Sequence, residues 1–371
     1  MTPVRILVDS MADQGLTNSQ MTNAREIIRR LDPARFHVSV FCGGAPDRTI
    51  EQRPNTRLVP LPQRRRTVRI FREFVLGRHD ILFYVKSSPA SRLYLNLRNL
   101  DLRNLGLRRR WGDRCVTVGT IESQSDLRNE PTVAPAAVHL WERTVLRCDY
   151  LFSNSQSVQQ SLRREYDLPS EIVPTGVNTR FFTPAWDRPA NSRPRVLFVG
   201  SLRPFKQPQL LLDAASRYLE ADFVLVGEGV MAEELKARIE REHLRNVTLS
   251  GLLGPEHLKQ QYQQADIFLF PSTWEGSPKV LLEAAASGVP IIARQNYQPE
   301  TVVHGETGYL AGSDDELFDR LQGLLSHPDQ RRKLGEAGRR HSERFDWDLI
   351  TRRWEEVFLD LMARKTAACA A

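Results

Sequence analysis

Two glutamates eight positions apart, Glu275 and Glu283, flank the start of a predicted helix and carry the most informative chemistry in the chain. An apolar strand precedes them, and a loop that contains Gly276 leads into the helix. We expect Ser277 to cap this helix and Pro278 to be its first residue, because serine and proline are favoured at those two positions. The free N–H groups of the first turn would then form an anion site that suits a diphosphate.

The side chains around this helix start have distinct expected tasks. The N–H groups of Ser277, Lys279 and Val280 would point at the anion, and the ammonium of Lys279 would add positive charge. Glu283 would lie about 7.5 Å further along the helix axis, where its carboxylate can accept hydrogen bonds from ribose hydroxyls. Glu275 would stand on the sugar side of the phosphates. A capped helix with two surface glutamates is the alternative reading of the same residues.

A second basic element follows the strand that ends at Val199-Gly200. The turn after it presents Arg203 and Lys206, and cations at the carboxyl end of a strand can neutralise the charge that develops on a departing diphosphate. A solvated basic turn is the alternative reading. The glycines of Val226-Gly227-Glu228-Gly229 predict a tight turn between a strand and a helix.

Short apolar runs alternate with helical patterns along the whole chain, which predicts two α/β domains of the Rossmann-like, doubly wound kind facing a cleft. We expect an N-terminal domain over residues 1–183, a proline-rich linker over 184–194, a second domain that carries the anion site over 195–345, and a C-terminal helix and tail over 346–371. That last helix has one apolar face, and we expect it to cross back to the first domain. Predicted strands are Arg5–Val8, His37–Phe41, Ile81–Val85, Cys115–Ile121, Tyr150–Ser153, Arg195–Gly200, Asp222–Val226, Asn246–Ser250, Ile267–Phe270 and Pro290–Ala293.

Composition narrows the class of protein further. The 371 residues contain no run of 18 apolar residues that would predict a membrane span, and the first residues lack the pattern of a signal peptide. Four widely spaced cysteines predict a reducing, cytoplasmic setting without a disulfide framework. The eight histidines show no metal-ligand spacing, so we expect neither a metal nor another cofactor. Asp346-Trp347-Asp348 imitates a metal-binding D-x-D signature, but its position before a helix favours a structural role.

Positive charge is concentrated in the first half of the chain. Residues 1–190 hold 29 Lys/Arg and 19 Asp/Glu, a net charge of +10, whereas residues 191–371 hold 23 and 26, a net charge of −3. Arginines interleaved with apolar residues predict a patch for an anionic membrane surface on the inner face of the membrane, and a solvated arginine-rich face is the equal alternative. A nucleic-acid-binding protein is the weaker hypothesis, because no recognised RNA- or DNA-binding motif accompanies the arginines. The expected patch consists of Arg64, Arg65, Arg66 and Arg69, and a second cluster runs from Arg103 to Arg114.

Five ordered motifs resemble those of retaining glycosyltransferases of the GT-B fold, in particular glycosyltransferase family 4. The E-x7-E motif of that family matches Glu275 to Glu283. The other matches are the V-G-x-L-x-x-x-K element at Val199–Lys206, P-x-G-V-[DN] with a following phenylalanine at Pro174–Phe182, V-G-x-G at Val226–Gly229, and Pro-Glu…Gly-x-x-Gly at Pro299–Gly308.

The resemblance implies a metal-independent transfer, with retention, of a sugar from a UDP- or GDP-sugar to a glycan or lipid-linked acceptor. It implies that Lys206 binds the donor phosphates, that Glu283 holds the ribose and that Glu275 contacts the transferring sugar. It also implies that the Gly276–Val280 backbone lines the sugar and phosphate site, and that the backbone near Leu253 meets the nucleobase.

The first half departs from the family pattern. Only Gly15 remains of a Gly-Gly loop, Glu122 stands near the place of a common histidine, and Ser201 replaces an arginine for which Arg203 can substitute. We assign Gly15 and Ser201 to the donor site and Glu122 to the acceptor side. The departures leave open a non-catalytic binding or scaffold protein of the GT-B type, and a nucleotide-sugar epimerase is a further alternative.

Overall fold

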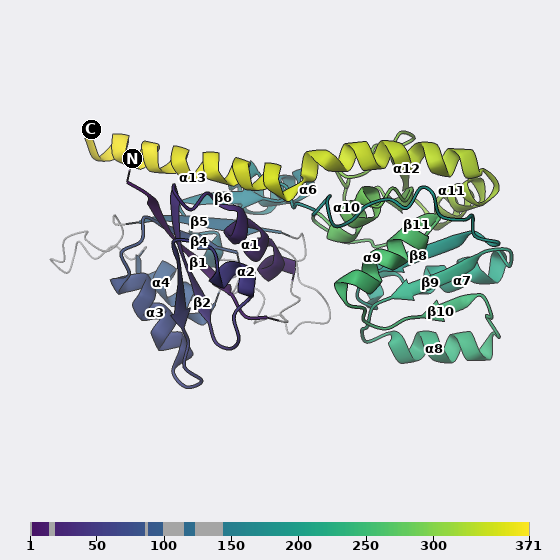
Figure 1. Ribbon diagram of the computed structural model, residues 1–371, viewed down its shortest axis with the longest axis horizontal. Coiled ribbons are helices and arrows are strands. Elements are labelled where there is room, and N and C mark those ends of the chain that lie inside the picture. Colours follow the sequence, from purple (N-terminus) through teal and green to yellow (C-terminus); the bar gives the residue numbers. More distant parts are fainter. Residues whose placement is uncertain (1, 15–18, 86–87, 99–114, 123–143, 371) are drawn as a thin grey trace. The chain divides into compact units, whose positions relative to one another are not determined.

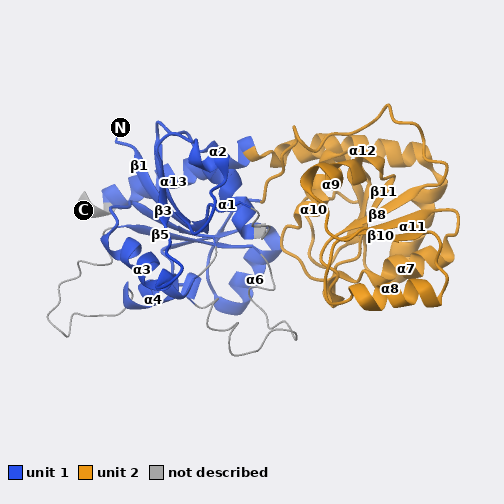
Figure 2. Ribbon diagram, turned by 60° about the horizontal axis from the view of Figure 1, so that its bottom comes forward, with its two compact units in different colours: residues 1–174, 348–371 blue, residues 175–347 orange. Residues whose placement is uncertain are grey.

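The chain folds into two compact units, residues 1–174 with 348–371 (unit 1) and residues 175–347 (unit 2), which Figure 2 shows in different colours. The structure, a computed structural model, describes residues 2–14, 19–85, 88–98, 115–122 and 144–370. The second cluster of arginines expected in the first half, Arg103 to Arg114, and Gly15 lie outside these ranges.

Unit 2 begins earlier than the predicted linker at residues 184–194, because the segment ahead of the linker is already part of it. The N–H group of Val177 donates to the carbonyl of Phe345 at 2.8 Å, and that of Trp347 donates to the carbonyl of Val177 at 3.1 Å. A Cβ atom at Gly176 would lie 2.4 Å from the Trp347 ring, so only glycine allows this close approach. The P-x-G-V element therefore has a structural role: its backbone joins the start of unit 2 to the end of unit 2.

Unit 1 is built on a parallel sheet of seven strands in the order β3-β2-β1-β4-β5-β6-β7. Helices connect most of the successive strands (Figure 1). Central strands such as β4 are buried on both faces, which explains their unbroken apolar runs. The elements are β1 (Val4–Met11), α1 (Ser19–Arg30), β2 (Phe36–Cys42), α2 (Arg48–Glu51), β3 (Thr56–Pro60), α3 (Arg66–Leu76), β4 (Ile81–Tyr84), α4 (Pro89–Arg98), β5 (Val116–Ile121), β6 (Tyr150–Ser153), α6 (Gln156–Tyr166) and β7 (Glu171–Ile172).

The C-terminal helix α13 (Trp347–Ala370) completes the core of unit 1, as the sequence predicts. Its Trp354 ring lies 4.9 Å from that of Phe83 and 5.1 Å from that of Phe152, between ring centroids, and its Phe358 ring lies 5.3 Å from that of Phe83. Leu349, near the start of the helix, is 43% exposed and does not belong to this buried face. The helix thus covers one face of the unit 1 sheet with its aromatic stripe.

Unit 2 repeats the design with six parallel strands in the order β10-β9-β8-β11-β12-β13. Its core joins the apolar residues of these strands to those of the covering helices. The elements are β8 (Arg195–Val199), η3 (Pro204–Lys206), α7 (Gln209–Arg217), β9 (Asp222–Val226), α8 (Ala232–Arg241), β10 (Val247–Leu249), α9 (Pro255–Gln264), β11 (Ile267–Phe270), α10 (Lys279–Ala286), β12 (Ile291–Arg294), β13 (Gly308–Ala311), α11 (Asp314–Ser326), α12 (Pro328–Ser342) and η4 (Glu343–Phe345).

Both strand orders reverse direction at one point, between β1 and β4 in unit 1 and between β8 and β11 in unit 2. Open parallel sheets bind ligands outside the carboxyl ends of their strands at such a switch point. The predicted fold class, two Rossmann-like doubly wound units, is confirmed, and the switch points indicate where each unit holds its ligand.

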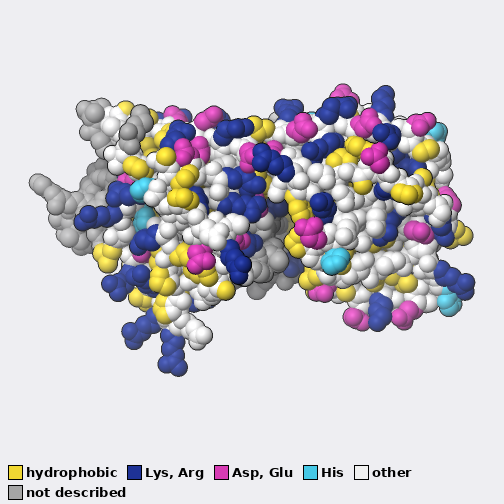
Figure 3. Space-filling view, in the orientation of Figure 1, with side chains coloured by type: hydrophobic (Ala, Val, Ile, Leu, Met, Phe, Trp, Pro, Cys, Tyr) yellow, Lys and Arg dark blue, Asp and Glu magenta, His cyan; other side chains and the backbone are white. Residues whose placement is uncertain are grey.

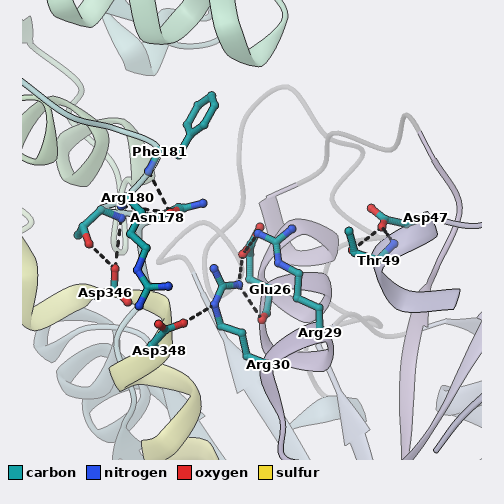
Figure 4. Close-up of polar contacts among 11 residues, drawn as sticks. Glu26, Arg29, Arg30, Asp47, Thr49, Asn178, Arg180, Phe181, Asp346 and Asp348 are labelled. Carbon is teal, nitrogen blue, oxygen red and sulfur yellow. Dashed lines mark hydrogen bonds and ion pairs between the residues drawn. The ribbon is translucent and has the colours of Figure 1, made fainter. Parts of the chain in front are cut away.

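The two aspartates of the D-x-D sequence have separate structural partners (Figure 4). In unit 2, Asp346 accepts hydrogen bonds from the N–H and hydroxyl groups of Thr179. In unit 1, Asp348 Oδ1 accepts from Arg30 Nε at 2.8 Å, and Glu26 holds the same arginine from within α1. The structural interpretation of this motif is confirmed.

Candidate functional site

A short 3₁₀ helix after β8 is hydrogen-bonded to the loop after β11. This contact brings the basic turn that carries Lys206 next to the loop that carries Glu275. The carbonyl of Phe205 in η3 accepts from the N–H group of Thr273 at 2.8 Å and from its hydroxyl at 3.1 Å. The hydroxyl oxygen of Ser272 lies 3.3 Å from the same carbonyl oxygen. Because β8 and β11 flank the switch point, the contact lies where a doubly wound sheet binds its ligand.

Lys206 and Glu275 form an ion pair at this place, between Lys206 Nζ and Glu275 Oε1. Their side chains are only 15% and 12% exposed, and the hydroxyl of Ser272 donates to the same carboxylate oxygen at 2.6 Å. The Lys206 ammonium also lies 5.1 Å from the centre of the Phe270 ring. The pair is therefore largely shielded from water, where electrostatic interactions are stronger than at an open surface.

Helix α10 begins one residue later than the sequence predicts. Pro278 is its N-cap in an extended conformation, Lys279 is its first residue, and no side chain caps it, so the expected cap at Ser277 is wrong. Proline has no N–H group of its own, and its preset φ suits the cap of this turn as well as the first helical position. The N–H groups of Lys279 and Val280 remain at the first turn, while that of Leu281 bonds the Pro278 carbonyl at 3.1 Å.

Glu283 projects from the second turn of α10 and is bound by a buried tyrosine. The hydroxyl of Tyr262 donates to Glu283 Oε2 at 2.9 Å. Burial raises the pKa of Glu283, although the tyrosine hydrogen bond and the charge of Lys279 oppose the shift. The carboxylate is oriented by a fixed partner and retains acceptor capacity for a further hydroxyl.

The remaining predicted donor residues lie on loops of unit 2. Arg203 is exposed and its side chain has no hydrogen bond or ion pair among the described residues, which leaves it free to bind an anion. Ser201 is half-buried, and its carbonyl accepts from the Arg203 N–H group at 2.9 Å. Leu253 is half-buried on the loop before α9. Gly276 and Pro278 are buried and Ser277 is half-buried within the loop that carries Glu275.

The V-G-x-G turn serves the backbone rather than a ligand. Gly227 has a φ of +142°, and a Cβ atom there would lie 1.9 Å from the carbonyl oxygen of Gly200. A Cβ atom at Gly229 would lie 2.3 Å from the carbonyl oxygen of Leu202. The two glycines let this turn lie directly against the loop that leads to Lys206, which agrees with the predicted tight turn.

In unit 1, Glu122 lies at the carboxyl end of β5 among buried amides. The side chain of Asn23 donates to Glu122 Oε2 at 2.8 Å, and that of Asn154 donates to the Glu122 carbonyl at 2.7 Å. Both asparagines are buried, and the side-chain oxygen of Asn23 has no hydrogen-bond partner among the described residues. A buried polar atom without a partner is costly, so this oxygen marks a place where a hydroxyl-bearing ligand would be stabilised.

Sequence reasoning missed the two asparagines and one aspartate of this unit. Asp9 lies within β1, next to the switch point, and the hydroxyl of Ser88 donates to Asp9 Oδ2 at 3.4 Å. Burial raises the pKa of Asp9 to about 7, and hydrogen bonds from Ser91 and Ser88 limit the shift. A polar residue inside or directly after an apolar strand is the signal that would have found Asp9 and Asn154.

The predicted arginine patch lies at the start of α3. Arg64, Arg65 and Arg66 are exposed and Arg69 is half-buried, and Figure 3 shows Lys and Arg side chains gathered over the part of unit 1 where α3 lies. No helix among the described residues is long and apolar enough to cross a membrane. The described residues also contain no cluster of three or more His, Cys, Asp or Glu side chains that could hold a metal ion.

Two family models match nearly all of the chain between them. Residues 22–181 match Glycosyltransferase Family 4, and residues 185–341 match Glycosyl transferases group 1. The chain is 30% identical over 255 residues to a D-inositol 3-phosphate glycosyltransferase of Corynebacterium diphtheriae, covering 62% of this chain and 60% of that protein. A protein of the same name from Streptomyces scabiei is 28% identical over 297 residues, covering 68% and 64%. The chain thus spans about three fifths of the length of such relatives.

Solved structures share the fold across almost the whole chain. A sucrose-phosphate synthase from Thermosynechococcus elongatus superposes with a TM-score of 0.78 at 21% identity, covering 98% of this chain and 100% of that one. Anabaena HepE in complex with UDP superposes with a TM-score of 0.73 at 16% identity, covering 96% and 100%.

Proposed function

Because the chain belongs to the GT-B-fold glycosyltransferases that resemble family 4, we propose that it transfers a sugar from a nucleotide-diphosphate sugar to an acceptor, with retention of the anomeric configuration. One observation carries this proposal. Lys206 and Glu275 come from two different strand ends and meet in a shielded ion pair beside the switch point of unit 2. A cation and a carboxylate so placed suit a diphosphate leaving group and the sugar attached to it.

In this proposal the residues of unit 2 hold the donor. Lys206 and Arg203 neutralise the diphosphate, and the N–H groups of Lys279 and Val280 bind its oxygens. Glu283, oriented by Tyr262, accepts hydrogen bonds from the ribose. Glu275 contacts the sugar, lined by the loop residues Gly276, Ser277 and Pro278. The backbone at Leu253 contacts the base, and Ser201 completes the part of the donor site that unit 2 supplies.

Retention follows when the acceptor attacks on the face from which the diphosphate departs. The bond between the anomeric carbon and the phosphate oxygen breaks, the acceptor oxygen bonds to that carbon, and the acceptor proton passes to a phosphate oxygen. The negative charge that develops on the phosphate is the species to stabilise, and a preorganised, shielded cation does this most effectively. Lys206 would exchange part of its contact with Glu275 for the diphosphate, so no metal is required by this scheme.

For the donor, we favour a uridine nucleotide over a guanosine one. This preference rests on Anabaena HepE, which shares the fold and was solved in complex with UDP, with UDP and glucose, and with UDP-glucose. For the acceptor, we propose a glycan or a lipid-linked molecule that enters beside Glu122, where the unpartnered side-chain oxygen of Asn23 can bind a hydroxyl group. The name of the relatives in sequence adds D-inositol 3-phosphate to the acceptors worth testing.

The patch of Arg64, Arg65, Arg66 and Arg69 would hold the protein on an anionic membrane surface, at the inner face of a membrane. Each cation near such a surface contributes about 1 kcal/mol of attraction, which fades as salt rises. This part of the proposal places the protein close to a lipid-linked acceptor.

The proposal is tested by a thermal-shift screen of UDP-, GDP- and ADP-sugars, followed by an acceptor-free hydrolysis assay on each donor that binds. We expect one class of donor to raise Tm and to be hydrolysed slowly, and we expect both effects to persist in excess chelator. Loss of binding in chelator would contradict metal-independent binding. Donor isomerisation without hydrolysis would indicate an epimerase, and binding without any turnover would indicate a non-catalytic protein.

A further inference from the structure

A solvent-accessible cavity of about 640 Å³ lies in unit 1, away from the carboxyl ends of the strands. It lies at the opposite end of the sheet, where the strands begin. Arg5 at the start of β1, His37 at the start of β2 and Arg57 at the start of β3 line it, together with the C-terminal half of α3. A volume of roughly 300–1,000 Å³ is typical of small-molecule sites. Asp9, within β1, and Glu122, directly after β5, lie towards the carboxyl ends of the unit 1 strands instead.

The lining of this cavity is strongly basic. Five arginines line it against one carboxylate, so the side-chain charge is 5 − 1 = +4 with the histidines neutral. The lining arginines are Arg5, Arg57, Arg69, Arg72 and Arg78, and the carboxylate is Glu73.

Two of the five arginines are neutralised by neighbours and three are not. Arg5 pairs with Asp80 at 2.9 Å, and Arg57 pairs with Glu73. The side chains of Arg69, Arg72 and Arg78 make no hydrogen bond or ion pair among the described residues. Three uncompensated guanidinium groups around one hollow attract an anion strongly, and guanidinium is the side chain best suited to bidentate phosphate binding.

A buried carboxylate keeps the floor of the cavity in place. Glu73 Oε1 also bonds His79 Nε2 at 3.0 Å, and Arg57 Nε donates to the hydroxyl of Ser39 at 3.2 Å. Burial alone would raise the pKa of Glu73, but the hydrogen bonds from Arg57 and His79 outweigh it and lower the pKa. The guanidinium of Arg57, although 54% of the side chain is exposed, is thus held by two partners, Glu73 and Ser39.

Glycine closes the turn beside this floor. A Cβ atom at Gly77 would lie 2.4 Å from both the Glu73 carbonyl oxygen and His79 Nε2. The chain therefore turns directly out of α3 and places Arg78 at the rim, two residues after the end of the helix.

We propose that this cavity binds a phosphate-bearing anion, at a site separate from the donor site of unit 2. The anion spans Arg57 at the floor and Arg69, Arg72 and Arg78 at the wall and rim. Its source is either a soluble phosphate ester or the headgroup of an anionic lipid. The second source is chemically possible because α3 exposes Val68 (55%) and Leu76 (67%) next to the same arginines.

The test uses the full chain and the double substitution Arg72→Gln with Arg78→Gln. Both side chains are exposed, so we expect their replacement to leave the fold intact. The matched control is Arg48→Gln with Arg245→Gln, which removes the same charge from two exposed arginines outside the cavity. One arm titrates inorganic pyrophosphate by calorimetry. The other measures co-sedimentation with vesicles of phosphatidylglycerol in phosphatidylcholine. The donor site binds pyrophosphate equally in all three proteins, so the difference between them reports on the cavity.

We expect the cavity substitutions to weaken at least one probe by about tenfold or more while the control changes it by less than about twofold, since each guanidinium contributes charge-assisted hydrogen bonds. An effect on pyrophosphate identifies a soluble phosphate, and an effect on vesicles alone identifies a lipid headgroup. Equal effects of the two double substitutions, or none from either, would overturn the site and leave only diffuse charge.

Discussion

Replacing Lys206 by alanine removes the cation that the proposed mechanism places against the departing diphosphate. The structure sets the size of the expected effect. The Lys206 and Glu275 side chains are 15% and 12% exposed, and the ammonium lies between two aromatic rings, 5.3 Å from the centre of Phe205 and 5.1 Å from that of Phe270. Solvent can replace little of the lost charge in such surroundings. We therefore expect kcat to fall about 10²- to 10³-fold, which corresponds to roughly 2.7–4 kcal/mol of transition-state stabilisation.

The same substitution leaves Glu275 without its cation, so stability must be measured beside activity. Breaking a fully buried ion pair costs about 3–5 kcal/mol, and this pair is partly exposed, so we expect a smaller loss. Ser272 still donates to the carboxylate. Adding Glu275→Gln removes the unpaired charge, and we expect the double variant to recover stability while its kcat stays low.

Steady-state kinetics on both variants, with nucleoside diphosphate affinity measured separately, separates the two effects. Turnover close to wild type in Lys206→Ala would refute the role of this lysine in stabilising the phosphate. Recovery of kcat in the double variant would mean that the unpaired glutamate, and not the missing cation, had impaired the single one.

Further substitutions test the other assignments. Glu283→Ala should weaken nucleoside diphosphate binding by on the order of 1.5–3 kcal/mol, because both ribose hydrogen bonds are lost; unchanged affinity in calorimetry would contradict the ribose contact. Glu275→Ala should lower turnover more than it weakens binding of the bare nucleotide, and the reverse result would mean that the two glutamates have exchanged tasks. Asp9→Asn should be more stable than wild type at pH 8: the folded protein holds its proton up to a pKa of about 7 whereas the unfolded chain releases it near 3.8, so wild-type stability falls by roughly 4 kcal/mol as pH rises between these values. Chemical unfolding across this range should show a flatter profile for the variant, and an unchanged slope would contradict the buried carboxyl. Glutamine substitution of the arginine patch should weaken binding to anionic liposomes at low salt without lowering Tm, and a wild-type protein that ignores such liposomes would reduce the patch to a solvated face; the four positions are Arg64, Arg65, Arg66 and Arg69.

The central strands are predictable from the sequence, whereas three of the four edge strands, β3, β7 and β13, are not; only the edge strand β10 is predicted. Strands such as β4 and β11 are buried on both faces and show as unbroken apolar runs. By contrast, β3 carries an arginine and a proline, and β13 begins with a glycine, so neither shows a strand pattern. Strands at the edge of a sheet have one neighbour, and their stability depends on pairing that the local sequence does not encode.

The candidate site divides in the same way. The spacing of Glu275 and Glu283 around a helix start can be recognised from the local sequence alone. The start of the helix was nevertheless predicted one residue too early, at Pro278, because the residue preferences of the N-cap and of the first helical position differ little. The ion pair between Lys206 and Glu275 joins residues 69 positions apart through hydrogen bonds to Phe205. No spacing rule contains that contact, because it depends on how β8 and β11 pair.

Helix α13 gives the two units different histories during synthesis on the ribosome. Unit 2 is one continuous segment that ends at Trp347, so all of its residues are available once that residue has emerged. Unit 1, although it precedes unit 2 in the chain, lacks the helix that covers Phe83 and Phe152 until α13 has been made. Its aromatic face stays open while the whole of unit 2 is translated, and exposed apolar surface of this kind promotes aggregation. Of the two units, the one that starts earlier is thus completed later, and its yield should depend more on chaperones and on an intact α13.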